Sequence, residues 1–151
     1  MCVAENTMDE KYLIFTIREK LYALPSKLIS EVTALEKVFP LPLVPGYVRG
    51  IINRYSVPYA LIDVCFLLFQ NLSSARKVIV LKEEVDKLAF LIDDVTDIAD
   101  ISPENLAKIE QDGDASDGSI SAFFEWKGNH ILCLEASEIL KRIKQDFQQE
   151  A

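Results

Sequence analysis

Acidic side chains are the residues of this chain whose type and spacing come closest to a metal site. Asp112, Asp114 and Ser116 are spaced like the first ligands of a calcium-binding loop. However, Asp117 occupies the position where the sharp turn of such a loop needs glycine, and Phe123 stands where the closing glutamate should be. We therefore predict a solvated acidic loop over 110–119 and no metal site.

A second group of acidic residues follows an apolar run in the middle of the chain. Carboxylates at this spacing can work as acid/base pairs or bind a metal ion, and the residues concerned are Asp93, Asp94, Asp97 and Asp100. The chain has 1 histidine, and no His/Cys cluster lies beside these carboxylates in the sequence. A solvated strand end explains them better than a catalytic or metal site.

The other residue types that do chemistry lack the motifs they would need. His130 has no serine or cysteine motif that would support nucleophilic catalysis, so a histidine at a strand edge is the better interpretation. Neither Gly-rich phosphate-binding motif is present. The aromatic residues Phe123, Phe124 and Trp126 have the type of a base-stacking platform, but in an acidic chain they fit a core or an interface better. We expect no enzyme activity, no catalytic residue and no cofactor.

Length and charge narrow the class of protein further. The 151 residues suffice for one domain with a real core, or for two small subdomains that share one. Lys and Arg number 16 against 24 Asp and Glu, which gives a formal net charge of -8. Such a charge repels phosphate backbones, and no basic patch is visible, so we do not expect a nucleic-acid partner.

The compartment is indicated by three features of the sequence. The N-terminus lacks the basic and apolar regions of a secretory signal. No apolar run approaches the roughly 20 residues of a membrane span. The 3 cysteines, Cys2, Cys65 and Cys133, are far apart and fit reduced thiols better than a disulfide framework. We expect a cytoplasmic protein that is not inserted in a membrane.

The stretch 50–63 predicts a central hairpin. Two apolar β-forming residues, Ile51 and Ile52, meet a polar corner over 53–56, and a second apolar run over 57–62 leaves it. Just upstream, the segment 39–46 contains closely spaced prolines, which favour an extended surface segment over helix or central strand.

Further apolar runs predict more strands and a buried core. Strands are expected over 12–17, 21–24, 26–34, 77–81, 88–92, 95–98, 121–126 and 130–134. The last two should form a hairpin that turns at Gly128-Asn129, and the short connections favour antiparallel pairing. The side chains expected in the core are Phe15, Ile17, Val80, Leu91 and Leu132.

Three helices are predicted around these strands. Asp63 precedes the apolar run 64–69 and should cap a helical turn. Ser102-Pro103-Glu104 has the residues of a helix start, and we expect a short helix that ends near Lys108. From Glu135 the apolar spacing becomes helical, which predicts a closing amphipathic helix. The expected fold class is mostly β.

The order and spacing of several motifs resemble the CheW-like family of chemotaxis coupling proteins over nearly the whole chain. The matching segments are Tyr12-Leu-Ile-Phe, Leu21-Tyr22, Glu31-Val32, the run 39–53 with Pro45-Gly-Tyr-Val-Arg-Gly50, Leu61-Ile-Asp63, and the segments 78–81, 91–97 and 131–134. The resemblance implies two small SH3-like five-stranded β-barrel subdomains packed over a shared core, with short helices and a C-terminal amphipathic helix. It places a flexible N-terminus at 1–10 and a single domain of two such subdomains at 11–148.

The resemblance also implies a function. Members of the family are non-catalytic adaptors that link the regulatory domain of a CheA-type histidine kinase to the cytoplasmic helical tip of a chemoreceptor. Two alternatives stay open: a divergent adaptor for another kinase or receptor pathway, and a β-barrel that binds a small ligand. By resemblance, the partner-binding residues are Ile29, Glu31, Val48, Gly50, Asn53, Arg54, Tyr55 and Val57.

The chain departs from the family pattern within the central hairpin. Where the family reads Asn-Leu-Arg-Gly, this chain reads Asn53-Arg54-Tyr55-Ser56, so the arginine comes one residue early. The pattern predicts that Glu31 loses a bidentate cationic partner, because a one-residue offset turns a strand side chain to the opposite face. The substitution Tyr55→Arg is then expected to raise receptor affinity by roughly 1 kcal/mol or more.

Three further departures lie outside that turn. Ala60 replaces the usual proline before the Leu-Ile-Asp end, with Pro58 two residues earlier. Asp94 and Ala122 each stand where the family has glycine. We expect the fold to be kept while one or both partner surfaces have diverged.

Overall fold

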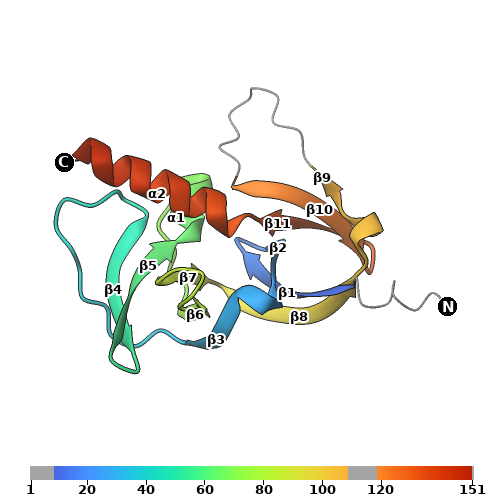
Figure 1. The fold of residues 1–151 in the computed structure, drawn as a ribbon, viewed down its shortest axis with the longest axis horizontal. Coiled ribbons are helices and arrows are strands. Elements are labelled where there is room, and N and C mark those ends of the chain that lie inside the picture. The colour runs from blue at the N-terminus through green and yellow to red at the C-terminus, as the bar shows by residue number, and fades with distance from the viewer. Residues whose placement is uncertain (1–8, 109–118, 151) are drawn as a thin grey trace.

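The computed structural model describes residues 9–108 and 119–150, and these residues build a mostly β protein. The predicted acidic loop with Asp112, Asp114, Ser116 and Asp117 lies outside the described residues. Two sheets lie side by side, and helix α2 (Ala136–Glu150) runs from one toward the other (Figure 1). The mostly β expectation is confirmed.

The first sheet holds strands from both ends of the chain. Its strand order is β8-β1-β2-β11-β10-β9. The strands are β1 (Glu10–Ile17), β2 (Lys20–Pro25), β8 (Asp94–Ile101), β9 (Ala107–Lys108), β10 (Ile120–Trp126) and β11 (Asn129–Leu134). Five strands form the body of this sheet and the two-residue β9 adds to its edge.

The second sheet is built from the middle of the chain. Its order is β3-β6-β7-β5-β4. The strands are β3 (Ile29–Ala34), β4 (Val48–Arg54), β5 (Val57–Asp63), β6 (Lys77–Leu81) and β7 (Leu88–Ile92). Helix α1 (Val64–Phe69) follows β5 directly, and a three-residue 3-10 turn, η2 (Ser26–Leu28), precedes β3. The strand predicted over 26–34 therefore begins at Ile29.

Three hydrophobic clusters explain how the sheets pack. One cluster joins residues of both sheets with α1 and α2, and it includes Phe15, Leu24, Ile62, Phe90 and Ile139. A second cluster belongs to the first sheet, around Ile14, Phe124 and Ile131. A third belongs to the second sheet, around Leu61, Val78 and Leu91. Each sheet thus buries one side chain set of its own and contributes another to a common core, because strand side chains alternate between faces.

The core prediction is correct at four positions of five. Phe15, Ile17, Val80 and Leu91 are buried. Leu132 is only partly buried against the common cluster. Its neighbours Ile131 and Cys133 are buried on the opposite face of β11. The expectation for Leu132 was wrong because an apolar run does not show which of its alternate faces is covered.

Two local predictions in the first sheet were also wrong. The helix expected from Ser102 to Lys108 is a three-residue 3-10 turn, η3 (Pro103–Asn105), without a side-chain cap, and β9 follows it. The last hairpin turns at Lys127-Gly128, and Asn129 already pairs with Trp126 in β11. Lys127 and Gly128 both have positive φ, at 50° and 80°, and glycine adopts this conformation readily.

The antiparallel pairing expected from the short connections is wrong for two pairs of strands. Most neighbours are antiparallel, including the hairpins β4–β5 and β6–β7. However, β5 pairs with β7 in parallel, and β11 pairs with β2 in parallel. The second of these pairings joins β2 to a strand from the far end of the chain. A local rule about connection length cannot predict such a long-range contact.

Candidate partner-binding surface

The residues expected to bind a partner gather on the second sheet. Ile29 and Glu31 lie on β3, and Val48, Gly50, Asn53 and Arg54 lie on β4, while Tyr55 is in the following turn and Val57 starts β5. β3 and β4 are the two outer strands of this sheet. Their side chains can meet only if the sheet curls, since three strands lie between them.

An ion pair connects these opposite edges. The Nε of Arg54 donates to one carboxylate oxygen of Glu31 at 2.9 Å, and its Nη2 donates to the other oxygen at 3.0 Å. The side chains are 22% and 24% exposed, so the pair is partly shielded from water. The hydrogen bond to Glu31 is the main reason that the pKa of Arg54 is raised above its ordinary value. Bidentate geometry of this kind fixes both groups.

The expected loss of a cationic partner for Glu31 is therefore wrong. Arg54 is the last residue of β4, and it shares a face with the buried Ile52, whereas Asn53 between them is exposed. That face turns toward β3, where Glu31 lies. The arginine that comes one residue early in the sequence thus reaches the acid, because it lies on the same face of β4 as Ile52. The affinity gain expected from Tyr55→Arg loses its premise.

Tyr55 lies outside β4, in the turn that directly follows Arg54. Tyr55 and Ser56 form a two-residue turn between the paired residues Arg54 and Val57, with φ of 53° and 68°. The side chain of Tyr55 is 84% exposed. Its ring centroid lies 5.2 Å from the guanidinium carbon of Arg54, which is within range of a cation–π contact.

Gly50 holds a covering segment against the outer edge of β4. Its φ is 140°, and a Cβ atom at this position would approach the carbonyl oxygen of Phe39 to 2.4 Å. Phe39 exchanges two backbone hydrogen bonds with Ile51, at 2.8 and 2.9 Å. Glycine is required because this close approach leaves no room for a side chain.

A hollow lies between the edge strands beside the ion pair. It has a volume of about 260 Å³, and its lining includes Thr33, Leu35, Phe39, Ile52, Arg54 and Val78. Cavities of roughly 150 Å³ hold one benzene ring, so the hollow has room for a bulky apolar side chain. Phe39, which lines the hollow, is an exposed apolar side chain.

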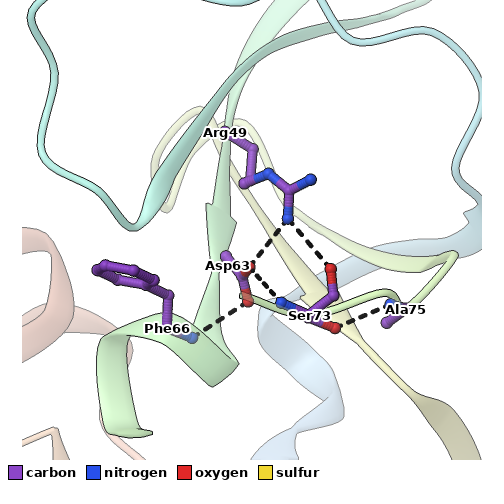
Figure 2. Close-up of polar contacts among 5 residues, drawn as sticks. All are labelled: Arg49, Asp63, Phe66, Ser73 and Ala75. Atoms are coloured by element: carbon purple, nitrogen blue, oxygen red, sulfur yellow. Dashed lines mark hydrogen bonds and ion pairs between the residues drawn. The ribbon is translucent and has the colours of Figure 1, made fainter. Parts of the chain in front are cut away.

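A second arginine of β4 binds a buried carboxylate, as Figure 2 shows. Asp63 is 0% exposed, and one of its oxygens accepts from Nη1 of Arg49 at 3.0 Å and from the backbone N–H of Ser73 at 3.0 Å. The other oxygen accepts from the N–H of Phe66 at 3.2 Å, which confirms the predicted cap of α1. Arg49 also donates to the carbonyl of Ser73 at 3.3 Å.

Sequence reasoning found only half of this network. Asp63 was expected to cap a helical turn, whereas Arg49 and Ser73 carried no motif that pointed to it. The only signal is that Arg49 lies in the Val-Arg-Gly segment that opens the hairpin, while Asp63 ends it. Antiparallel pairing of β4 with β5 brings these ends together, with Val48 opposite Ile62.

Two further departures from the family pattern have local explanations. Pro58 lies opposite Asn53, before β5 begins to pair with β7 at Ala60. A proline there removes no hydrogen bond from the ladder with β7. Asp94 accepts from Lys77 at 2.8 Å, which links β8 of the first sheet to β6 of the second. This hydrogen bond is the main reason that the pKa of Asp94 is lowered, helped by the backbone N–H of Val95. The structure shows no special role for Ala122.

The other acidic residues and the histidine do not converge on one site. Asp93 accepts from the backbone N–H of Arg18 at 2.8 Å, and Asp100 pairs with Lys11 at 2.9 Å. His130 lies 2.5 Å from a carboxylate oxygen of Glu125. Within 9–108 and 119–150, no group of three or more His, Cys, Asp or Glu residues is arranged to hold a metal ion.

The two described cysteines are buried thiols without a disulfide. Burial is the main cause that raises the pKa of Cys133 to about 12, and burial raises the pKa of Cys65 as well. Such thiols are unreactive at neutral pH. Across the part of the chain that the structure describes, no helix is long and apolar enough to cross a membrane.

Comparison with known proteins identifies the family. The model of the CheW-like domain matches residues 11–144. No curated protein gives a significant match. The crystal structure of the scaffolding protein TtCheW from Thermoanaerobacter tengcongensis is similar in fold, with a TM-score of 0.75 and 19% identity over 85% of this chain and 90% of that chain. The chain therefore belongs to the CheW-like family, the coupling adaptors of chemotaxis signalling.

Proposed function

We propose that this adaptor links a CheA-type histidine kinase to chemoreceptors. One surface binds the regulatory domain of the kinase, and the surface around the Glu31–Arg54 pair binds the helical tip of the receptor. On this proposal the chain needs no catalytic residue, metal or cofactor for its task, and it works in the cytoplasm. The observation that carries the proposal is the bidentate Glu31–Arg54 pair, which exists although the sequence of the turn departs from the family pattern.

The proposal includes a division of the fold into two subdomains within one domain, residues 11–148. Each sheet has a hydrophobic cluster of its own, which supports a closed SH3-like barrel around each. The pair Glu31–Arg54 supports closure of the second barrel, because it spans the outer strands of that sheet. A shared cluster keeps the subdomains in a fixed relation, and this rigidity suits a protein that must hold two partners at once.

The charges at the edge strands favour a receptor-binding surface there. They fit a site for nucleic acid or a small ligand less well. The Glu31–Arg54 pair neutralises its own charges. The hollow beside it is lined by apolar side chains such as Leu35, Phe39 and Ile52, together with the polar or charged residues Glu36, Lys37 and Asn53. An apolar centre within a polar rim is the usual composition of a protein–protein interface. The alternative of an adaptor for a different receptor or kinase rests on Tyr55, which replaces the family arginine at an exposed position.

Recovery of partners from cells tests this function. The tagged chain should co-purify with a histidine kinase and a chemoreceptor from the organism that carries it. Glu31→Arg should reduce recovery of the receptor, and the charge swap Glu31→Arg with Arg54→Glu should restore part of it, since the swap rebuilds the ion pair. Glu104→Arg, on exposed η3 of the first sheet, is the matched charge control. Recovery of neither partner by the wild type would refute the coupling function.

A further inference from the structure

We infer that Tyr55 is the aromatic anchor of the receptor-binding surface and determines which receptor this adaptor selects. The inference rests on the proposed function and adds to it a residue and a partner chemistry. Tyr55 projects from the tip of the β4–β5 hairpin with 84% of its side chain exposed. Large exposed aromatic side chains at a rigid position are the residues that most often dominate interface energies.

The backbone at Tyr55 is strained, and its side chain, which is 84% exposed, gains only a cation–π contact with Arg54 in return. Tight two-residue hairpin turns need positive φ at both residues and favour Asn-Gly. Tyr55 and Ser56 adopt φ of 53° and 68° without glycine or asparagine. Strain at a residue whose side chain makes so little contact with the fold points to a function for that residue.

Two other turns of the same kind show what local support looks like. The Lys127-Gly128 turn has glycine at its second position. The Arg18-Glu19 turn, with φ of 53° and 69°, is anchored because the N–H of Arg18 donates to Asp93 at 2.8 Å and its guanidinium lies 5.2 Å from the ring of Phe69. The turn at Tyr55 has no glycine, and its side-chain support is the cation–π contact with Arg54 described above.

Arg54 prepares Tyr55 for binding. The guanidinium is fixed by two hydrogen bonds to Glu31, and its carbon lies 5.2 Å from the centre of the tyrosine ring. The ring thus rests against a group that is itself immobile. Tyrosine has few rotatable bonds, so an oriented ring loses little conformational entropy when a partner covers it.

The partner that this arrangement fits is a pair of packed helices. A ring at a hairpin tip can enter the depression between side-chain ridges on two neighbouring helices, which is a surface that the proposed receptor tip presents. The depression must be lined by small or apolar residues, and an acceptor at its base must take the phenol proton, because a buried hydroxyl needs a hydrogen-bond partner.

The substitution Tyr55→Asn separates binding from folding. Asparagine suits the positive φ at 55, so the variant should melt about 2–4 °C higher than the wild type. Loss of the ring should at the same time weaken binding of a purified receptor tip fragment about 10- to 30-fold. Glu19→Asn is the control: it places asparagine at the second residue of a turn with nearly the same φ angles, and it should leave receptor affinity unchanged.

Each outcome decides the inference. Equal affinity of wild type and Tyr55→Asn for the receptor fragment would overturn it, and so would a loss of affinity confined to the kinase regulatory domain. Tyr55→Arg should also weaken binding of the receptor fragment. Tighter binding by this variant would overturn the inference, because it would show that a cation at position 55 binds better than the ring. If the wild type binds neither partner, the proposed function fails first. The two failures are therefore distinguishable.

Discussion

The two arginines of β4 form ion pairs in very different surroundings. Arg49 reaches the fully buried Asp63, whose two oxygens also accept backbone N–H groups from α1 and from the loop before β6. Arg54 reaches Glu31 with good bidentate geometry, yet both side chains keep contact with water. The first pair cannot be opened without leaving a charge in the core. The second pair is partly in contact with water, so opening it leaves neither charge fully buried.

Removal of the buried carboxylate is the strongest way to test this difference. We expect Asp63→Ala to lower the free energy of unfolding by about 3–5 kcal/mol, because Arg49 and two backbone N–H groups lose their acceptor. Chemical denaturation measures the loss. Asp100→Ala, which removes an exposed partner of Lys11, is the control and should unfold like the wild type. Equal stability of Asp63→Ala and wild type would place Asp63 outside the structural core.

Gly50 lies between Arg49 and Arg54 in β4, so its substitution tests whether the two ion pairs are independent of each other. Gly50→Ala should cost about 1–3 kcal/mol, since a Cβ atom would meet the carbonyl of Phe39 at 2.4 Å and the residue has φ of 140°. Displacement of Phe39 should also weaken receptor binding, because Phe39 lines the hollow beside Arg54. Gly128→Ala is the matched control, as no atom lies within 4 Å of its would-be Cβ. Normal receptor binding by a destabilised Gly50→Ala would separate the covering segment from the partner surface.

The partly buried Glu31–Arg54 pair should contribute less to folding than to binding. In a double-mutant cycle, Glu31→Ala and Arg54→Ala should give a coupling energy of about 0.5–1.5 kcal/mol for unfolding, because water screens part of the interaction. The same cycle on receptor affinity should give the larger coupling. High salt should reduce the coupling at Glu31–Arg54 more than the cost of Asp63→Ala. A coupling for folding that exceeds the one for binding would make this pair structural, like Arg49–Asp63.

The Lys77–Asp94 pair, which links the two sheets, should give the smallest effect. It extends the comparison to an ion pair at the surface. The pKa of Asp94 is lowered from 3.8, mainly by the hydrogen bond from Lys77. A carboxyl whose pKa is lowered by folding stabilises the fold above its unfolded pKa, and this contribution is lost as the pH falls through the folded value. Wild type should therefore melt slightly above Asp94→Asn at neutral pH and lose that margin below pH 3.8. A margin that is constant with pH would contradict this assignment.

Much of the fold could be predicted from the sequence because its signals are local. Alternation and turn residues placed the hairpin over 50–63, the β6–β7 hairpin and the first strand close to their observed bounds. The acid before the run 64–69 predicted the start of α1, since the cap and the N–H that it accepts from are three residues apart. The order of the motifs also identified the family, which the match over 11–144 confirms.

The site depended on contacts that no local pattern contains. Glu31 and Arg54 lie 23 positions apart on the outer strands of one sheet, so only its curl shows that they meet. Arg54 lies on the same face of β4 as Ile52 and reaches Glu31, which overturned the expectation that an early arginine would face away. Arg49 finds Asp63 through strand register, and β2 meets β11 from the other end of the chain. Sequence determined which segments extend and which faces are apolar; tertiary packing decided which charges pair, because pairing depends on distances between strands that separate parts of the chain supply.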